Sequence, residues 1–352
     1  MPSASRWFIH FTLPFFLAAS SLRRALETAA QARYNAFQIM QIVDLRLMTP
    51  RQMEPLFEEE ARQWLEDLHW DYRPSLALIR RFLDTRSLAG RAALEDGRAA
   101  GYGFYVLEEN KALLGGLFVS RPFFGSALGE ELLRSILTGL QQQPNIERIE
   151  TQLMPFGHAL DAALAEHKFR LYTRQFMLLP LAQARPSPAG GAAPRPRLER
   201  WNDRSFEPCA RLIQAAYAEH VDGEINEQYR TTQGAIKFLR NIVVLPGCGQ
   251  FLGDASFLAF DPQRGTLAGA VLTSAVSSGV GHTTQLCVLP ECQSQGLGRQ
   301  LLEASIAALS ARRFEALSLT VTSANSRAVQ LYERMGFQTK RTFAAAVWEG
   351  QR

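Results

Sequence analysis

The chain has 352 residues, which is long for one compact domain and suits two. Its 47% hydrophobic and 20% charged residues are ordinary for a globular protein. The formal net charge of +4 is small and spread along the chain. It suits a polyanionic ligand but excludes the strongly basic pattern of a nucleic-acid-binding protein.

Residues 1–39 leave three interpretations open. An apolar run over residues 7–20 resembles a signal peptide with a small-residue cleavage site. This run is too short and too interrupted to span a bilayer, so we expect no integral membrane span. A second interpretation makes Met40 the true start, because residues 40–47 look like a first strand and the extension is then dispensable. The third is an additional helix or an anchor at the membrane surface.

The next part of the chain is rich in predicted strands and ends in a linker. Apolar patterns predict strands at 100–106, 111–119 and 149–153. Residues 182–196 are rich in Pro, Gly and Ala and have no apolar periodicity, which is typical of a linker. The sequence therefore predicts two domains of similar size, residues 40–181 and residues 197–352.

The C-terminal half alternates between helical and extended patterns. In chain order we expect a strand at 197–201, helices at 206–219 and 232–241, strands at 255–261, 267–275 and 282–288, a helix at 296–310, a strand at 317–322, a helix at 326–335 and a strand at 342–348. This order predicts a mixed α/β domain.

The turn before the helix at 296–310 is suited to a phosphate. Gly296 and Gly298 carry no side chain, so a ligand can approach the backbone closely. The free amides and the positive end of the helix dipole favour a phosphate or pyrophosphate, and Arg299 adds a charge there. The GK[ST] of a P-loop is absent, and Leu301 replaces the third Gly of GxGxxG, so neither of those nucleotide-binding motifs applies.

A second motif follows the strand at 317–322. Residues 325–337 read N-S-R-A-V-Q-L-Y-E-R-M-G-F. Asn325 and Ser326 can cap the start of a helix, and Gly336 can end it. Ala328 and Tyr332 lie on one helical face, which favours a helix packed against a sheet.

Together these segments resemble the GNAT (GCN5-related) N-acetyltransferases. The acyl-CoA pyrophosphate loop of that family, [RQ]-x-x-G-x-[GA], is filled here by Gln293, Gly296 and Gly298, and the pattern N-x-x-A-x-x-L-Y-x-x-x-G-F matches at every fixed position. The resemblance implies a mixed, mostly antiparallel sheet flanked by helices, with acetyl-CoA as co-substrate. It also implies a set of cofactor contacts, made by the backbone of Leu286, Cys287 and Val288 and by Gln293, Ser294, Gln295, Gly296, Leu297, Gly298, Arg299 and Asn325.

The N-terminal half repeats this pattern. Gly129 aligns with Gly298, 169 positions later, and Phe169 aligns with Phe337, 168 positions later. Two nearly equal offsets at separate points predict a tandem GNAT protein.

The N-terminal copy has lost the residues that would hold a pyrophosphate. Ala127 stands where Gly296 is expected, Phe124 replaces Gln293, and Glu130 replaces Arg299 with the opposite charge. We therefore expect a folded but catalytically inactive domain, which binds no acetyl-CoA and supports the active domain or shapes its substrate cleft.

The resemblance also suggests catalytic roles. Tyr332 is the candidate general acid that protonates the departing thiolate, although a tyrosine at this position also packs a helix on a sheet. The general base is left open. His220, Asp222, Glu224 and Glu227 lie between the first two helices of the C-terminal half, in a segment that is otherwise a solvated loop. His282, at the start of the strand expected to bind the cofactor, is a second candidate.

The expected function is acetyl transfer from acetyl-CoA to a primary amine by direct attack in a ternary complex. The amine belongs to a small molecule or a protein N-terminus, and the oligomeric state is left open. A non-catalytic acyl-CoA-binding regulatory module is the alternative, although the intact motifs argue against it.

The four cysteines match no zinc spacing, so no metal is expected and reduced thiols in a cytoplasmic protein are the simpler interpretation. Cys287 is expected to be a core residue rather than a nucleophile.

Overall fold

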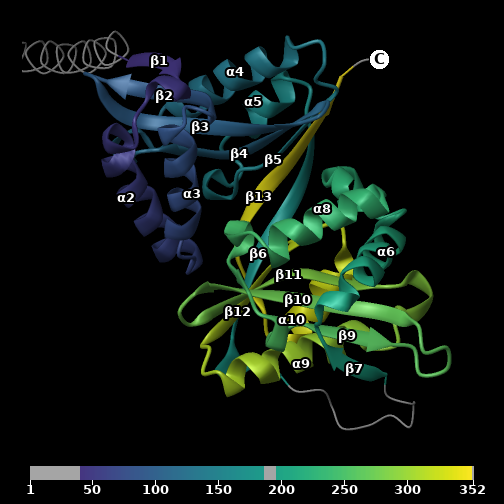
Figure 1. Cartoon of the computed structure of the whole chain (residues 1–352). Coiled ribbons are helices and arrows are strands. Elements are labelled where there is room, and N and C mark those ends of the chain that lie inside the picture. The colour runs from purple at the N-terminus through teal and green to yellow at the C-terminus, as the bar shows by residue number, and fades with distance from the viewer. Residues whose placement is uncertain (1–39, 186–195, 351–352) are drawn as a thin grey trace, which may run out of the picture.

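The computed structural model describes residues 40–185 and 196–350 (Figure 1). The three interpretations of residues 1–39, and most of the predicted linker, lie outside the described residues. Within the described ranges, no helix is both long enough and apolar enough to cross a membrane.

The N-terminal half is built from strands with helices on both faces. Its helices and strands are β1 (Met40–Asp44), α2 (Pro50–Leu68), α3 (Arg73–Asp84), β2 (Ala89–Glu95), β3 (Arg98–Glu108), β4 (Lys111–Val119), α4 (Leu128–Gln141), β5 (Arg148–Gln152), α5 (Asp161–Glu166) and β6 (Arg170–Pro180). The start of α2 is fixed by Thr49 and Gln52, whose side chains and backbone amides form a capping box.

The C-terminal half contains every element that the sequence predicted there. Its elements are β7 (Arg197–Arg200), α6 (Phe206–Tyr217), α7 (Val221–Ile225), α8 (Thr232–Val243), β8 (Gln250–Phe251), β9 (Phe257–Phe260), β10 (Leu267–Ser277), β11 (Val280–Val288), α9 (Leu297–Ala311), β12 (Ala316–Thr322), α10 (Ser326–Met335) and β13 (Gln338–Glu349). Asn325 caps α10 through its side chain, and Gly336 ends it in the left-handed region, as predicted. The short α7 and β8 were not predicted, because five and two residues show no periodicity.

The two halves repeat each other element by element. Strands β3 and β10 have 11 residues each and begin 169 positions apart, and β4 and β11 have nine each at the same offset. The N-cap residues of α4 and α9, Ala127 and Gly296, differ by the same number of positions. Each half also contains a parallel strand pair, β4 with β5 and β11 with β12. The predicted tandem architecture is therefore confirmed.

The two halves exchange their last strands. The strand order is β1-β2-β3-β4-β5-β13-β6-β12-β11-β10-β9-β7, with β8 paired to β10. Strand β6 of the N-terminal half pairs with β12, and β13, the last strand of the chain, pairs with β5. Figure 1 shows β13 and β6 running between the two halves. The division into residues 40–181 and 197–352 therefore describes the order of the repeats along the chain. In space, each half of the sheet contains strands from both ranges.

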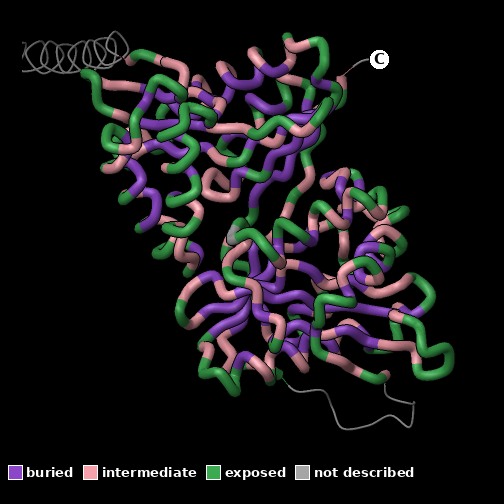
Figure 2. The backbone as a smooth tube through the Cα atoms, in the orientation of Figure 1, coloured by how far each residue is buried: buried purple, intermediate pink, exposed green. Residues whose placement is uncertain are grey.

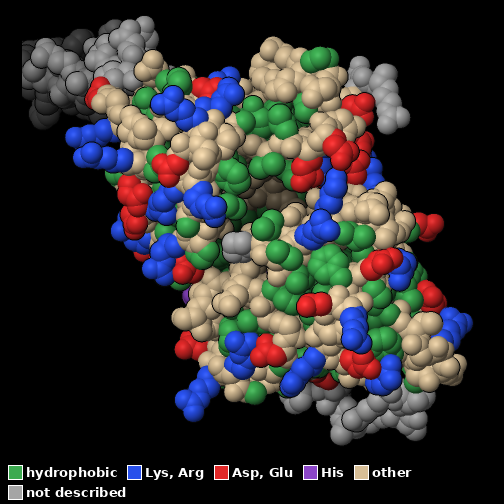
Figure 3. Space-filling view, viewed as in Figure 1, with side chains coloured by type: hydrophobic (Ala, Val, Ile, Leu, Met, Phe, Trp, Pro, Cys, Tyr) green, Lys and Arg blue, Asp and Glu red, His purple; other side chains and the backbone are tan. Residues whose placement is uncertain are grey.

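Apolar residues on both faces of the strands hold the helices. Leu301, Leu302 and Leu309 on α9 are fully buried against the C-terminal half of the sheet. A second cluster joins α6 and α8 to β10 and β11. Figure 2 shows buried residues concentrated along the strands, and Figure 3 shows both signs of charge mixed over a face that is hollowed between the two halves.

Candidate active site

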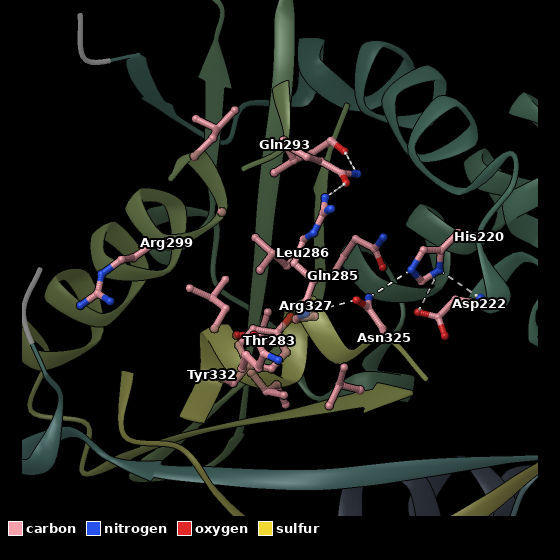
Figure 4. A pocket seen from close by; sticks show the side chains of 18 of the residues that line it. His220, Asp222, Thr283, Gln285, Leu286, Gln293, Arg299, Asn325, Arg327 and Tyr332 are labelled. Carbon is pink, nitrogen blue, oxygen red and sulfur yellow. Dashed lines mark hydrogen bonds and ion pairs between the residues drawn. The ribbon is translucent and has the colours of Figure 1, made fainter. Parts of the chain in front are cut away.

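A cavity of about 680 Å³ opens near the C-terminal ends of β11 and β12. These strands pair from Val280 with Ala316 to Thr283 with Leu319, and their pairing ends there. The rest of β11, up to Val288, continues to pair with β10 on its other side. The gap between the strands therefore exposes one edge of β11 to the cavity, which Figure 4 shows from close by.

The turn between β11 and α9 places backbone amides at the wall of this cavity. Gly296, the N-cap of α9, has a φ of +81°, a conformation that strains residues with a side chain. A Cβ built on Gly298 would meet Leu331 and Val288 at 3.7 and 3.9 Å, so the glycine leaves this part of the wall uncovered. Because the Gln300 amide makes the first intrahelical bond, to the Gly296 carbonyl at 3.0 Å, the preceding amides are free for an anion.

The structure brings most of the expected cofactor contacts together. Nine of the eleven expected contacts line the cavity, namely Leu286, Val288, Gln293, Ser294, Gly296, Leu297, Gly298, Arg299 and Asn325. Cys287 and Gln295 are outside this lining. The Gln295 side chain donates to the Glu291 carbonyl at 3.1 Å. Cys287 packs in the core beneath α6 and α8, where burial raises the pKa of its thiol to about 12, so it has the environment of a core residue.

Two arginines near the turn have different surroundings. The Arg299 guanidinium donates to Glu303 at 2.8 Å and to the Arg185 carbonyl at 3.0 Å, and Figure 4 shows it on the far side of α9. Arg327 on α10 instead donates to the Gln293 side chain at 3.0 Å. Arg327 was not predicted as a site residue, because it occupies a variable position of the motif.

Tyr332 is buried at the cavity wall, with 7% of its surface exposed. Burial raises the pKa of its phenol above the usual value, and the negative charge of Asp222 acts in the same direction. The phenol therefore keeps its proton at neutral pH, as a proton donor must. Its ring also packs on Phe337, with centroids 5.7 Å apart, so the structural and chemical roles coexist.

His220, Asp222 and Asn325 meet on one side of the cavity (Figure 4). The Asn325 amide nitrogen lies 3.0 Å from His220 Nε2, and the Asp222 backbone amide donates to His220 Nδ1 at 3.1 Å. The Thr322 hydroxyl donates to the Asp222 carboxylate. The side-chain oxygen of Asn325 accepts from the Ala328 amide at 3.2 Å, so the same residue caps α10 and holds the histidine.

The other candidate bases lie outside the cavity lining. Glu224 accepts from the Tyr172 hydroxyl at 2.7 Å, and Glu227 lies 3.8 Å from the Lys111 ammonium group. His282 packs on Trp70 with ring centroids 4.9 Å apart, and burial lowers the pKa of its imidazole to about 3.

Sequence reasoning also missed Tyr217, Tyr229 and Arg174, which line the cavity. Tyr217 at the end of α6 donates from its hydroxyl to the Leu286 carbonyl at 3.2 Å, and its ring stacks on Tyr229 at 4.6 Å. Arg174 reaches the cavity from β6, which belongs to the N-terminal half of the chain. No family motif covers these positions, and for Arg174 only the strand exchange could have revealed it.

The corresponding turn in the N-terminal half is filled by side chains. The rings of Phe124 and Phe156 stack with centroids 6.1 Å apart. A Cβ built on Gly129, the counterpart of Gly298, would come within 2.9 Å of Phe156. Glu130 lies in the first turn of α4 and places a negative charge where α9 carries the positive charge of Arg299. These features disfavour a phosphate at this turn.

The cysteines and acidic residues give no sign of a metal centre. All four cysteines are free thiols, and no group of His, Cys, Asp and Glu residues suited to a metal ion occurs within residues 40–185 and 196–350.

Comparisons with known proteins agree on a family and a fold. Residues 214–337 match the model of the Acetyltransferase (GNAT) family. A mycothiol acetyltransferase from Propionibacterium freudenreichii subsp. shermanii is 28% identical over 151 residues, which are 42% of this chain and 44% of that protein. The match thus spans less than half the length of this curated relative.

Solved structures resemble the whole chain in fold. A GCN5-related N-acetyltransferase from Sphaerobacter thermophilus has a TM-score of 0.64 at 15% identity, covering 88% of this chain and 95% of that one. A tandem GNAT protein from the clavulanic acid biosynthesis pathway has a TM-score of 0.53 at 14% identity, covering 89% and 99%.

Proposed function

Because the chain has the tandem GNAT architecture and residues 214–337 belong to the acetyltransferase (GNAT) family, we propose that its C-terminal half transfers an acetyl group from acetyl-CoA to a primary amine. The observation that carries the proposal is the gap between β11 and β12, which leads from the free amides at the start of α9 to the buried phenol of Tyr332. A cytoplasmic location, where acetyl-CoA is available, is part of the proposal.

Acetyl-CoA fits the two kinds of group along this gap. Its pyrophosphate suits the amides at Gly296 and Gly298 and the adjacent guanidinium of Arg327, because amides at a helix start and a cation both favour negative charge. Its pantetheine arm, which carries amide donors and acceptors, suits the exposed edge of β11 near Leu286 and Val288. The Tyr217 hydroxyl, which donates to the Leu286 carbonyl, borders this edge.

The remaining groups suit direct transfer in a ternary complex. A neutral amine attacks the thioester carbonyl, the carbon–nitrogen bond forms, and the carbon–sulfur bond breaks. His220, beside the Asp222 carboxylate, takes the proton that the amine releases, and Tyr332 donates its proton to the departing thiolate. Holding both substrates in one cavity supplies much of the rate enhancement.

The acceptor is proposed only as a class. Similarity to a protein named for mycothiol, a small molecule, favours a small-molecule amine over a protein N-terminus. Retention of Tyr332, His220 and Asp222 in one cavity favours an enzyme over a non-catalytic acyl-CoA-binding regulatory module.

The test combines calorimetry with a turnover assay on the full-length protein. We expect acetyl-CoA to bind once per chain and thiol to be released in the presence of some amine from a panel of small amines and N-terminal peptides. Binding without turnover on any amine would support the regulatory module instead. Failure to bind acetyl-CoA would refute the proposal, and binding at two sites would refute an inactive N-terminal copy.

A further inference from the structure

Arg174 brings a positive charge from the N-terminal half into the C-terminal cavity. Its backbone on β6 lies opposite Thr322 on β12. One terminal nitrogen of its guanidinium donates to the Gln152 side chain at 3.2 Å, and the other lies 3.5 Å from the Thr320 carbonyl. Both of these contacts are neutral, so they orient the guanidinium without balancing its charge.

The guanidinium of Arg174 has no acidic partner among the described residues. No carboxylate oxygen of these residues lies within 4.0 Å of it, whereas Arg299 in the same cavity lies 2.8 Å from Glu303. Its Nε is buried and has no hydrogen-bond partner in the described part of the chain. An unpaired cation with a buried, unused donor is costly in a folded protein unless a ligand satisfies it.

A second donor with the same deficit lies in this cavity. Gln285 on β11 accepts from the Tyr229 hydroxyl at 3.3 Å through Oε1, while its Nε2 is buried without a partner among the described residues. Amide and guanidinium N–H groups can only donate. Both groups line the same cavity, and each suits a ligand with acceptor oxygens.

The position of Arg174 separates it from the cofactor turn. Arg327 lies at that turn, against Gln293, and is the cation placed to meet phosphate. Arg174 instead contacts β12 and the end of β5, and its charge lowers the phenol pKa values of Tyr332 and Tyr229, opposing the effect of burial. It therefore lines the cavity together with Tyr332, on the side that the strand β6 of the N-terminal half provides.

We propose that Arg174, with Gln285, binds an anionic group of the acceptor, a carboxylate close to the amine that is acetylated. A carboxylate presents two acceptor oxygens, which suit the fork of an arginine and an amide that lines the same cavity. The acceptor is then zwitterionic, with its amine toward His220 and Asp222 and its carboxylate toward Arg174. This inference rests on the proposed acetyl transfer, and it gives the N-terminal half a direct role in choosing the substrate.

The experiment compares matched acceptors on the full-length protein. Each pair consists of an amino acid and its carboxamide, including α-, β- and γ-amino acids and dipeptides, assayed by thiol release from acetyl-CoA. The proteins are the wild type, Arg174→Gln and Arg174→Lys. Calorimetry with acetyl-CoA on each protein checks the cofactor site independently. A failure of the wild type to bind acetyl-CoA would therefore contradict the proposed function, and not the role of Arg174.

We expect the wild type to prefer the carboxylate member of a pair. Arg174→Gln should raise the KM for the carboxylate about 10- to 100-fold, the range of a lost charged hydrogen bond. The KM of the carboxamide and the affinity for acetyl-CoA should stay within about twofold, well below the tenfold step of 1.4 kcal/mol. Arg174→Lys should restore part of the preference, because it keeps the charge but not the fork.

Three results would overturn the inference. The first is equal use of both members of each pair by the wild type. The second is a fall of kcat in Arg174→Gln by the same factor for carboxylates and carboxamides, which would place Arg174 in charge stabilisation of the reacting groups. The third is normal acetyl-CoA binding with turnover restricted to amines that carry no anionic group, or with no turnover of any amino acid on the panel.

Discussion

Thr322 on β12 donates its hydroxyl hydrogen to the carboxylate of Asp222. The backbone of the same threonine lies opposite Arg174 on the exchanged strand β6. One residue therefore connects an acidic group of the C-terminal half with a basic group of the N-terminal half. The strand exchange therefore holds the two halves together and also determines which charged side chains face the cavity.

The turn at Gly296 offers a test with a matched control. Replacement Gly296→Arg places a side chain at a φ of +81° and at the wall of the cavity, so it should weaken acetyl-CoA binding by about 100-fold or more, equal to about 2.7 kcal/mol. Gly125 in the N-terminal half has the same φ of +81° and open space around it. Gly125→Arg therefore introduces the same backbone strain away from the cavity.

Calorimetry with acetyl-CoA, together with circular dichroism to verify folding, separates the two variants. Gly125→Arg should bind like the wild type. Unchanged affinity in a folded Gly296→Arg protein would remove the assignment of this turn to the pyrophosphate.

Tyr332→Phe tests the proton donor without emptying the core. The ring that packs on Phe337 is kept, and only the hydroxyl is lost. We expect kcat to fall by about 10²- to 10⁴-fold, the usual contribution of a positioned acid, while the affinity for acetyl-CoA is unchanged. Single-turnover kinetics with saturating acetyl-CoA would check this, and a kcat equal to that of the wild type would leave Tyr332 with packing as its only role.

Glu60 in α2 should make the folded protein less stable as the pH rises. Only 3% of its surface is exposed, the Tyr102 hydroxyl donates to it at 2.6 Å, and burial raises its pKa from 4.5 to about 8. The unfolded chain releases this proton near pH 4.5 and the folded chain near pH 8, so the unfolded state is increasingly favoured between these values.

The variant Glu60→Gln keeps the shape and the acceptor but cannot ionise. Relative to the wild type, it should gain on the order of 3 kcal/mol of unfolding free energy between pH 5 and pH 8.5. Denaturant unfolding at both pH values measures this difference. A constant difference at the two pH values would mean that Glu60 is ionised in the folded protein.

The two motifs of the C-terminal half account for most of what could be predicted, because a turn with Gly296 and Gly298 and a helix with Tyr332 have local signatures. The elements of the C-terminal half followed from the same local signals, whereas helices α2 and α3 of the N-terminal half were not predicted. The site followed only in part. Arg174 reaches the cavity through pairing between distant strands, which no local pattern records.

The ambiguity among the acidic residues had a similar cause. Asp222, Glu224 and Glu227 are neighbours in sequence, but the short helix α7 and the turn after it direct their side chains toward different partners. Asp222 faces Thr322 at the cavity, whereas Glu224 and Glu227 face Tyr172 and Lys111 of the N-terminal half. A turn of five residues has no periodicity from which this divergence could be predicted.

His220 and His282 form a natural pair for the question of the base. His220 lines the cavity, and His282 lies in the core between Trp70 and Phe176. His220→Asn should lower kcat/KM by about 10²-fold or more, the lower end of the usual contribution of a general base. His282→Asn should retain most of the wild-type kcat/KM at neutral pH. Steady-state kinetics on both variants with one acceptor measures this difference. If His282→Asn were the inactive protein, His282 and not His220 would be the base.

His282 should also make the stability of the folded protein depend on pH, independently of its activity. Its pKa is about 3 in the folded protein and about 6.5 in the unfolded chain, so the unfolded chain binds the proton first as the pH falls. The contribution to stability is fully present above pH 6.5 and is lost between pH 6.5 and pH 3. From pH 8 to pH 5 the wild type should lose about 2 kcal/mol more than His282→Asn does. Urea unfolding of the two proteins at these pH values measures the difference, and parallel pH curves would show that the imidazole takes up a proton in the folded state, against the effect of its burial beside Arg174.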